Sequence, residues 1–171
     1  MLRTILATAT LAAIPSLANA ADVTTVNTLD VERYMGLWYE IAAFPQIFQT
    51  GCHNTTANYT LQDDGSVKVE NKCRLFWSSG FPIGATGRAT IANALEPRKL
   101  KVSFFNSPGA DYWILALAPD YSYAMVGDPG RKTLWILSRE KTMERYIYEK
   151  LLQTANDQEF DIERLKRTDQ D

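Results

Sequence analysis

The sequence predicts an all-β fold, an eight-stranded up-and-down antiparallel β-barrel with one C-terminal α-helix packed outside it. Three observations predict this. Short strand-like segments follow one another, separated by turn signals about every 8–14 residues. A single segment with helical periodicity follows the last of them. Gly36-Leu37-Trp38 opens the series, and Trp135-Ile136-Leu137-Ser138-Arg139 ends it. A large ring can plug one end of a small barrel, with an arginine over its face.

Residues 1–20 are expected to lie outside the fold. Met1-Leu2-Arg3 carries one positive charge, residues 4–17 are mostly apolar, and Ala18-Asn19-Ala20 has the small-x-small pattern of a cleavage site. These features are typical of a secretory signal peptide. The apolar run is too short to span a bilayer, and no cysteine marks a lipid anchor. Cleavage near Ala20 would leave a single domain of residues 21–171, located in the periplasm or secreted.

Size and charge exclude some classes of partner. One domain is expected from the length, and it is large enough to bury its own core. The net charge is −2 for the whole chain, and residues 1–20 contribute one of the basic residues. This balance suggests neither nucleic acid nor an anionic membrane surface as a partner. No segment after residue 20 is apolar and long enough to be transmembrane.

The expected strands can be placed one by one from alternation and turns. Asp63-Asp64-Gly65 is a strong hairpin signal, and Asp128-Pro129-Gly130 marks a later turn. Residues 85–92 are rich in small side chains, whereas residues 112–118 are apolar almost throughout. The expected strands are residues 37–44, 54–61, 66–74, 85–92, 100–105, 112–118, 121–126 and 132–138.

The pattern changes after Arg139. A helix is predicted from Arg145 to about Asn156, with Thr142 as a candidate cap. Met143, Ile147, Leu151 and Leu152 share one face of it, which would lie against the outside of the sheet. Phe160 and Ile162 are expected to add a short pairing segment, and residues 166–171 are expected to fray.

The motifs resemble those of the lipocalin family, and within it the bacterial and apolipoprotein D-like lipocalins. The first motif matches Gly36 and Trp38 with Tyr39-Glu40-Ile41-Ala42, the second Asp120-Tyr121 with Tyr123-Ala124, and the third Arg139. The hairpin from Asn58 to Ser66 is also similar to the bacterial members. One departure is the missing cysteine at the processing site, since the best-known bacterial members are outer-membrane lipoproteins. Membrane anchoring is therefore in doubt.

The resemblance implies an internal pocket for one small hydrophobic ligand. Gly36, Trp38 and Arg139 would form the floor. On the first strand Glu40, Ala42 and Phe44 share the parity of Trp38. Trp113, Leu115 and Leu117 would point outward, under the helix, and the small residues Ala85, Gly87 and Ala89 would keep the pocket open. The pocket lining implied by the family is Tyr59, Val69, Phe104, Tyr112, Ile114, Val126, Trp135 and Leu137. The alternative is that these side chains fill a core, as small barrels allow.

The two cysteines, Cys52 and Cys73, are expected to form a disulfide, the default outside the cytoplasm. Counting back from the hairpin turn puts Cys73 opposite a residue near Thr56. Cys52 would therefore have to curl back from the loop beside Gly51. The alternative is a free Cys73 thiol facing the pocket as a nucleophile, but no activating histidine is evident.

Other reactive chemistry is sparse. His53 is the only histidine, so the sequence contains neither a cluster of histidine metal ligands nor a plausible catalytic triad. Glu40 is the one charge of inward parity on the first strand, where it could accept hydrogen bonds near the floor or pair with Arg139. No metal and no cofactor are expected.

Two functions remain. The first is a non-enzymatic carrier that binds, transports or stores a fatty acid, a lysophospholipid or a similar lipid in the cell envelope. The alternative is an enzyme acting on a lipophilic substrate, with Cys73 or Glu40 as the reactive group. The tyrosine hydroxyls are expected to orient a polar head near the mouth, with Phe48 shielding the entrance. We expect a monomer or a weak homodimer.

Overall fold

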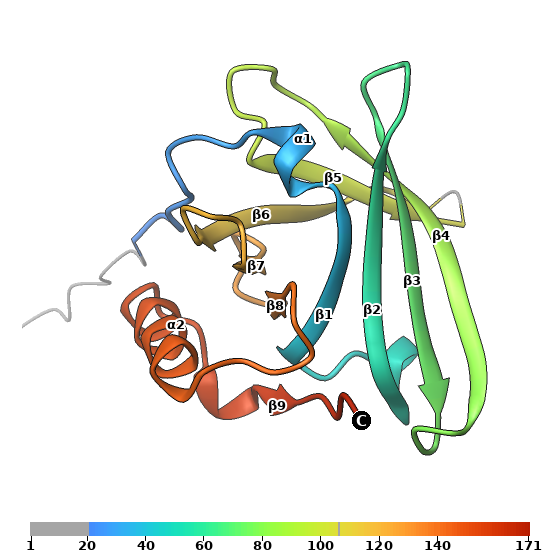
Figure 1. Cartoon of the computed structure of the whole chain (residues 1–171). Coiled ribbons are helices and arrows are strands. Elements are labelled where there is room, and N and C mark those ends of the chain that lie inside the picture. Colours follow the sequence, from blue (N-terminus) through green and yellow to red (C-terminus); the bar gives the residue numbers. More distant parts are fainter. Residues whose placement is uncertain (1–20, 106) are drawn as a thin grey trace, which may run out of the picture.

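A computed structural model describes residues 21–105 and 107–171, so the expected signal peptide lies outside the described residues. Figure 1 shows a barrel whose strands follow the chain in order, with one longer helix beside it. The strands are β1 (Gly36–Ala43), β2 (Cys52–Leu61), β3 (Val67–Leu75), β4 (Phe81–Ile91), β5 (Lys99–Phe104), β6 (Ala110–Leu117), β7 (Tyr123–Gly127), β8 (Leu134–Ser138) and β9 (Lys166–Arg167). The helices are α1 (Val31–Tyr34) and α2 (Arg145–Asp157), with 3₁₀ turns η1 (Ile47–Gln49) and η2 (Ile162–Arg164).

The sheet closes on itself through β1. From β2 to β8 each strand pairs antiparallel with the next, and β1 pairs with both β8 and β2. On one side Gly36 lies opposite Tyr59, and on the other Glu40 lies opposite Leu137. The predicted eight-stranded up-and-down barrel is therefore confirmed.

One strand is longer than its local sequence indicates. β4 begins at Phe81 rather than at residue 85, and it pairs with β3 from Leu75 opposite Phe81 onward. Pro82 and Gly84 weaken the strand pattern of this stretch. The adjacent edge of β3 nevertheless holds it, because cross-strand pairing overrides local propensity.

Two β-bulges change which residues face inward. The register of β1 shifts between Glu40 and Ala42, and that of β6 shifts between Ile114 and Ala116. An extra residue reverses the alternation beyond it. Ala42 and Phe44 therefore pack in the outer cluster, and Leu117 packs in the inner one. The expected inward direction of Ala42 and Phe44 and the outward direction of Leu117 were wrong.

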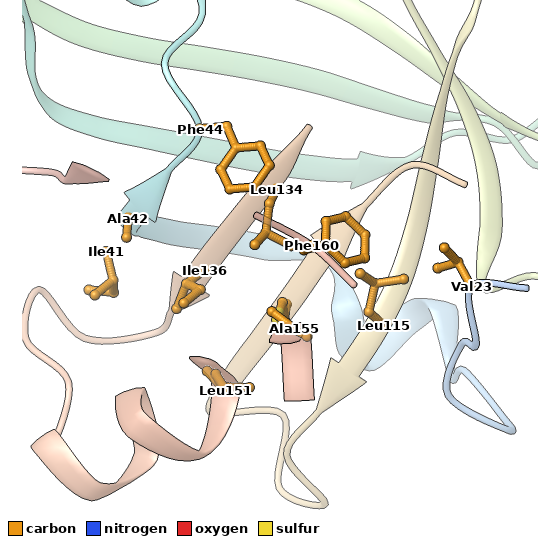
Figure 2. Packing of buried hydrophobic residues seen from close by; sticks show 11 residues of the cluster. Val23, Ile41, Ala42, Phe44, Leu115, Leu134, Ile136, Leu151, Ala155 and Phe160 are labelled. Atoms are coloured by element: carbon orange, nitrogen blue, oxygen red, sulfur yellow. The ribbon is translucent and has the colours of Figure 1, made fainter. Parts of the chain in front are cut away.

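The outer cluster joins α2 to the outside of the barrel. Figure 2 shows Leu151 and Ala155 of the helix close to Ile136 and Leu115 of the strands. Met143, Ile147 and Leu152 pack against the same cluster, which confirms the predicted helix face. The cap differs, since Glu144 occupies the N-cap position without a side-chain hydrogen bond. Thr142 was the wrong choice of cap.

The C-terminal segment is ordered, contrary to the expectation that it frays. Lys166 and Arg167 pair with Ala43 and Ala42 of β1. Beyond them, the Thr168 amide donates to the carbonyl of Ile41 (3.0 Å), and the Asn54 amide donates to the carbonyl of Asp169 (2.8 Å). The tail therefore lies between β1 and β2 where these strands have separated. The expected pairing segment at Phe160 and Ile162 was also misplaced, because pairing begins only at Lys166.

Packing inside the barrel is tightest at the end where β1 begins. There Trp38, Tyr59 and Val67 are buried in the inner cluster. At the opposite end of the same wall Ile83 is 40 % exposed, although it lies on the inner face of β4 with Ala89. The barrel thus has a filled floor and a more open far end, here called the mouth. Among the described residues, no helix is long and apolar enough to cross a membrane.

Candidate functional site

The floor of the barrel is built from Trp38 and Arg139. The guanidinium carbon of Arg139 lies 3.8 Å from the centre of the Trp38 ring. Arg139 also donates to the backbone carbonyls of Leu37 (2.7 Å), Met35 (2.8 Å) and Arg33 (3.0 Å). These carbonyls lie around the end of α1 and the start of β1, and the last carbonyls of a helix have no intrahelical partner. Arg139 therefore hydrogen-bonds the backbone where the chain enters the barrel, and it covers the Trp38 ring that closes the floor.

Gly36 is the residue that lets β1 start beneath this arginine. Its φ is +91°, in the region that favours glycine. A Cβ there would lie 3.5 Å from Nη1 of Arg139, which is an ordinary van der Waals contact. The glycine of the first motif is therefore explained by its backbone conformation rather than by lack of space.

The second motif packs on the same corner. Asp120 accepts from the Ser122 amide (3.1 Å), which holds the turn between β6 and β7. The guanidinium carbon of Arg33 lies 4.1 Å from the centre of the Tyr121 ring, and the Asp30 amide donates to the Tyr121 hydroxyl (2.9 Å). The three motifs therefore meet around α1.

Three tyrosine hydroxyls meet inside the barrel, just above the floor. The Tyr112 hydroxyl lies 2.9 Å from that of Tyr34 and 2.8 Å from that of Tyr59. Three O–H groups share two hydrogen bonds, so one proton has no phenol acceptor. Burial raises the pKa of Tyr59 to about 12 and also raises the pKa of Tyr34 and of Tyr112. The hydroxyls lie at the closed end, so their expected place near the mouth was wrong.

The residues expected to line a pocket all belong to the inner cluster. Tyr59, Val69, Ile114, Val126 and Leu137 are buried in it. Phe104, Tyr112 and Trp135 are partly buried and pack against it. They share one surface of the barrel wall. Their contact with a ligand stays a prediction.

Small residues on β4 shape the wall opposite these aromatic rings. A Cβ on Gly87 would lie 2.8 Å from the ring of Phe104 and 2.6 Å from the carbonyl oxygen of Ser103. Glycine at this position therefore lets the Phe104 ring lie against the backbone of β4. Ala85, two residues nearer the mouth on the same face, is only partly buried.

Glu40 is buried at the seam where the tail joins β1. Its carboxylate accepts from the Gln49 side-chain amide (2.9 Å) and from the Thr168 hydroxyl (2.6 Å). Burial raises the pKa of Glu40 more than these hydrogen bonds lower it. Arg139 donates to backbone carbonyls instead, so the expected pairing of Glu40 with Arg139 was wrong.

Cys52 and Cys73 form a disulfide with a Cα–Cα distance of 5.5 Å, as predicted. The expected place of Cys73 near Thr56 agrees with the register, in which Thr56 lies opposite Lys72, but Cys52 belongs to β2 and not to the loop before it. Cys52 lies opposite Leu75. An irregularity in β2 between His53 and Thr56 brings Cys52 closer in register to Cys73 than counting back from the hairpin turn indicates. The bridge ties β2 to β3 near the mouth. It consumes both sulfurs, which excludes the alternative of a free Cys73 nucleophile.

The comparisons with known proteins agree with this geometry. A family model described as a lipocalin-like domain matches residues 29–170. The chain belongs to the lipocalin family. Temperature-induced lipocalin-1 of Arabidopsis thaliana is 40% identical over 157 residues, covering 87% of this chain and 83% of the relative. Outer membrane lipoprotein Blc of Escherichia coli strain K12 is 39% identical, covering 82% and 78%. Apolipoprotein D of Oryctolagus cuniculus is 38% identical, covering 82% and 77%.

The solved structures support the same fold. Insecticyanin from Manduca sexta matches with a TM-score of 0.68 at 24% identity, over 88% of this lipocalin and 86% of that chain. Apocrustacyanin A1 from lobster matches with a TM-score of 0.65 at 22% identity, over 82% and 79%. Lipocalins bind small hydrophobic ligands, which fits a barrel with a filled floor and a more open mouth.

Two residues of this lipocalin's inner wall escaped the sequence reasoning. Tyr34 is the last residue of α1, and it is buried in the inner cluster. Asn71 shares a face of β3 with Val69 and Cys73, and within the described residues its carboxamide oxygen is buried without a hydrogen-bond partner. Asn71 is two residues from Val69 on the same strand, and this spacing could have predicted that it faces inward. A buried amide oxygen without a partner favours a ligand that brings a hydrogen-bond donor.

Within residues 21–105 and 107–171, no group of three or more His, Cys, Asp or Glu side chains is arranged to hold a metal ion.

Proposed function

We propose that this lipocalin binds a single amphipathic lipid, such as a fatty acid or a lysophospholipid, inside the barrel and carries or stores it outside the cytoplasm. The observation that carries the proposal is the gradient along the inner wall. Side chains near the floor are fully packed, whereas Ile83, Ala85 and Trp135 toward the mouth are only partly buried. A tail entering from the mouth would cover the exposed part of this apolar wall.

The driving force would be the burial of the acyl chain. Each buried CH₂ contributes roughly 0.8 kcal/mol, so a tail of about twelve carbons gives on the order of 9 kcal/mol before ordering costs. The carboxamide of Asn71 and the spare proton of the tyrosine cluster offer two polar positions on an otherwise apolar wall. This composition suits an amphiphile better than a plain hydrocarbon.

The proposed location is the periplasm or the medium. The disulfide supports it, because such bonds persist in oxidising compartments. The relatives named outer membrane lipoprotein Blc are consistent with a role in the cell envelope.

A carrier is favoured over an enzyme. With both cysteines in a disulfide, Glu40 is the remaining candidate for a reactive group. Each of its carboxylate oxygens already accepts a hydrogen bond from the mouth loop or from the tail. Those contacts join parts of the wall and support a structural role.

The decisive experiment compares two neighbouring positions of β4 that face opposite ways. Ala85→Trp would fill the inner wall, whereas Thr86→Trp would place the same ring on the outside. Titration with a long-chain fatty acid and with a lysophospholipid, followed by tryptophan fluorescence, should give saturable binding in the wild type. We expect Ala85→Trp to weaken it at least about tenfold and Thr86→Trp to leave it unchanged.

Equal effects of the two variants, or a wild type that binds neither lipid, would overturn the carrier proposal. Native mass spectrometry of protein purified from its own host would then name the ligand class if lipid copurifies.

A further inference from the structure

Large apolar side chains are exposed on two loops at the mouth. Ile47 is 95 % exposed, Phe48 72 %, Phe76 63 %, Trp77 54 % and Phe81 71 %. Ile47 and Phe48 lie in η1 between β1 and β2, and the other three lie at the β3–β4 turn. Both loops are at the end opposite Trp38, because β1 starts at the floor and runs toward the mouth. These five residues are called the rim below.

The rim is one surface rather than scattered side chains. The Phe76 amide donates to the carbonyl of Gly51 (2.7 Å), which joins the two loops. The Cys52–Cys73 bridge lies directly behind this contact. The ring centres of Phe76 and Trp77 are 5.9 Å apart, and Phe81 follows as the first residue of β4. The aromatic rings therefore lie together on two loops that are joined by this hydrogen bond and by the disulfide between β2 and β3.

Charge is distributed unevenly around the rim. The whole chain carries 20 acidic residues, yet residues 41–62 and 71–95 contain none. Lys72 and Arg74 lie beside the rim on the exposed face of β3. The net charge of the chain gave no reason to expect an anionic surface, but the mouth differs from the rest of the molecule. The two rim loops combine exposed aromatic rings with neighbouring cations and contain no carboxylate, and the tail carboxylate of Asp169 beside them lies 3.4 Å from the imidazole of His53.

We propose that the rim docks this lipocalin on the surface of a lipid bilayer that contains anionic lipids, with the barrel mouth against the bilayer. Tryptophan and phenylalanine are favoured at the boundary between headgroups and acyl chains. Anionic headgroups would attract Lys72 and Arg74, and the two rim loops contain no carboxylate that would have to be desolvated or repelled. Polar residues of the same two loops, such as Gln46 and Ser78, can remain at headgroup level.

A second copy of the chain is a poorer occupant of the rim. A symmetric pair would bring the same surface of each protomer together, and therefore Lys72 and Arg74 of both copies. Like charges placed together disfavour such a contact. The rim also consists of side chains on projecting loops, whose rings can enter a fluid surface without a complementary groove.

The rim continues into the inner wall. Phe81 and Ile83 lie on the same face of β4 as Ala85 and Gly87. If the proposed carrier function holds, a lipid could pass from the bilayer to the barrel along this apolar face. Docking itself does not depend on that function, so the two are tested separately.

The test measures vesicle binding of the full chain without added ligand. Cosedimentation would use phosphatidylcholine vesicles with and without phosphatidylglycerol. We expect the wild type to bind, and to bind the anionic vesicles more tightly. A Phe48→Ser/Trp77→Ser double variant should lose at least about tenfold in affinity. Leu95→Ser is the matched control, since Leu95 is 87 % exposed on the loop between β4 and β5, outside the rim.

A second readout follows Trp77 directly. Vesicles containing brominated phosphatidylcholine should quench part of the tryptophan fluorescence of the wild type, and Trp77→Phe should remove the quenched part. Replacing Lys72 and Arg74 with glutamine should abolish the preference for anionic vesicles. Circular dichroism of each variant would verify that the barrel is folded.

Three results would overturn the docking proposal. The wild type could fail to bind either vesicle while still binding fatty acid in solution, which would leave the carrier function standing alone. The Leu95→Ser variant could lose as much affinity as the double rim variant. Sedimentation could instead show a dimer that the double rim variant abolishes, which would assign the rim to a second copy of the chain.

Discussion

The guanidinium of Arg139 caps the ring of Trp38 at 3.8 Å and at the same time binds the backbone carbonyls of Leu37 and Met35. One side chain from the end of the last barrel strand thus closes the floor and fixes the start of the first strand. The contact joins the two ends of the barrel sequence, and we expect it to control stability more than ligand binding.

Replacing Arg139 with alanine should lower the free energy of unfolding by about 2–4 kcal/mol, because several carbonyls lose a charged donor and the cation–π contact is lost. Lysine should restore only part of this, since an ammonium group cannot reproduce the planar fork. Urea denaturation measures the free energy of unfolding of the alanine and the lysine variants. The control is Arg145→Ala, on an exposed face of α2, which should leave the free energy of unfolding nearly unchanged. A neutral Arg139→Ala variant would contradict the assigned role.

The disulfide should contribute measurably to stability. Cys52 and Cys73 are 21 residues apart in the sequence. Closing a loop of that size contributes roughly 3 kcal/mol in the chain-entropy model. The double variant Cys52→Ser/Cys73→Ser should lose about that much in chemical denaturation, and a reductant should destabilise the wild type but not the variant. A wild type whose unfolding midpoint is unaffected by reductant would argue against this contribution.

Alkaline pH should destabilise the barrel through its tyrosine cluster. Burial raises the pKa of Tyr59 to about 12, whereas an unfolded tyrosine titrates near 10. The unfolded chain then loses its proton first, so stability is retained below about pH 10 and falls as pH rises toward 12. Tyr59→Phe should lose less stability over this interval than the wild type does. Tyr146→Phe, at an exposed position on α2, should follow the wild type. Identical pH profiles for Tyr59→Phe and the wild type would contradict the burial argument.

The stability of the barrel should also depend on pH in the acidic range, because of Glu40. Burial raises its pKa above the usual value of 4.5, so the folded state holds the proton after the unfolded chain has lost it. The contribution of Glu40 to stability is therefore present below about pH 4.5 and is lost as pH rises through the folded pKa. The stability of the wild type relative to Glu40→Gln should decline over that range in thermal unfolding. Glu149→Gln, on the exposed face of α2, should show no such trend against the wild type. A difference between Glu40→Gln and wild type that stays constant with pH would rule out the raised pKa.

Local patterns in the sequence were sufficient to determine the number and order of the eight barrel strands, but not the short β9. Alternation predicted most of β5, turn residues separated β2 from β3 and β7 from β8, and the spacing of Met143, Ile147 and Leu151 predicted the buried face of α2. These features depend on residues close together in the chain, and side-chain periodicity follows directly from helix or strand geometry. The cysteine pair was also predictable, because it needed only two cysteines in a chain expected to be exported.

Only the tertiary structure decided which way some of these residues face and what the tail does. The bulges in β1 and β6 turned Ala42 and Leu117 to the faces opposite those expected, because one extra residue reverses the alternation beyond it. The charged tail became ordered because the separation of β1 from β2 leaves backbone groups that Thr168 and Asp169 satisfy. Barrel closure also brought Tyr34, Tyr59 and Tyr112 together at the floor. Each outcome depends on contacts between residues far apart in the sequence, which a local pattern does not encode.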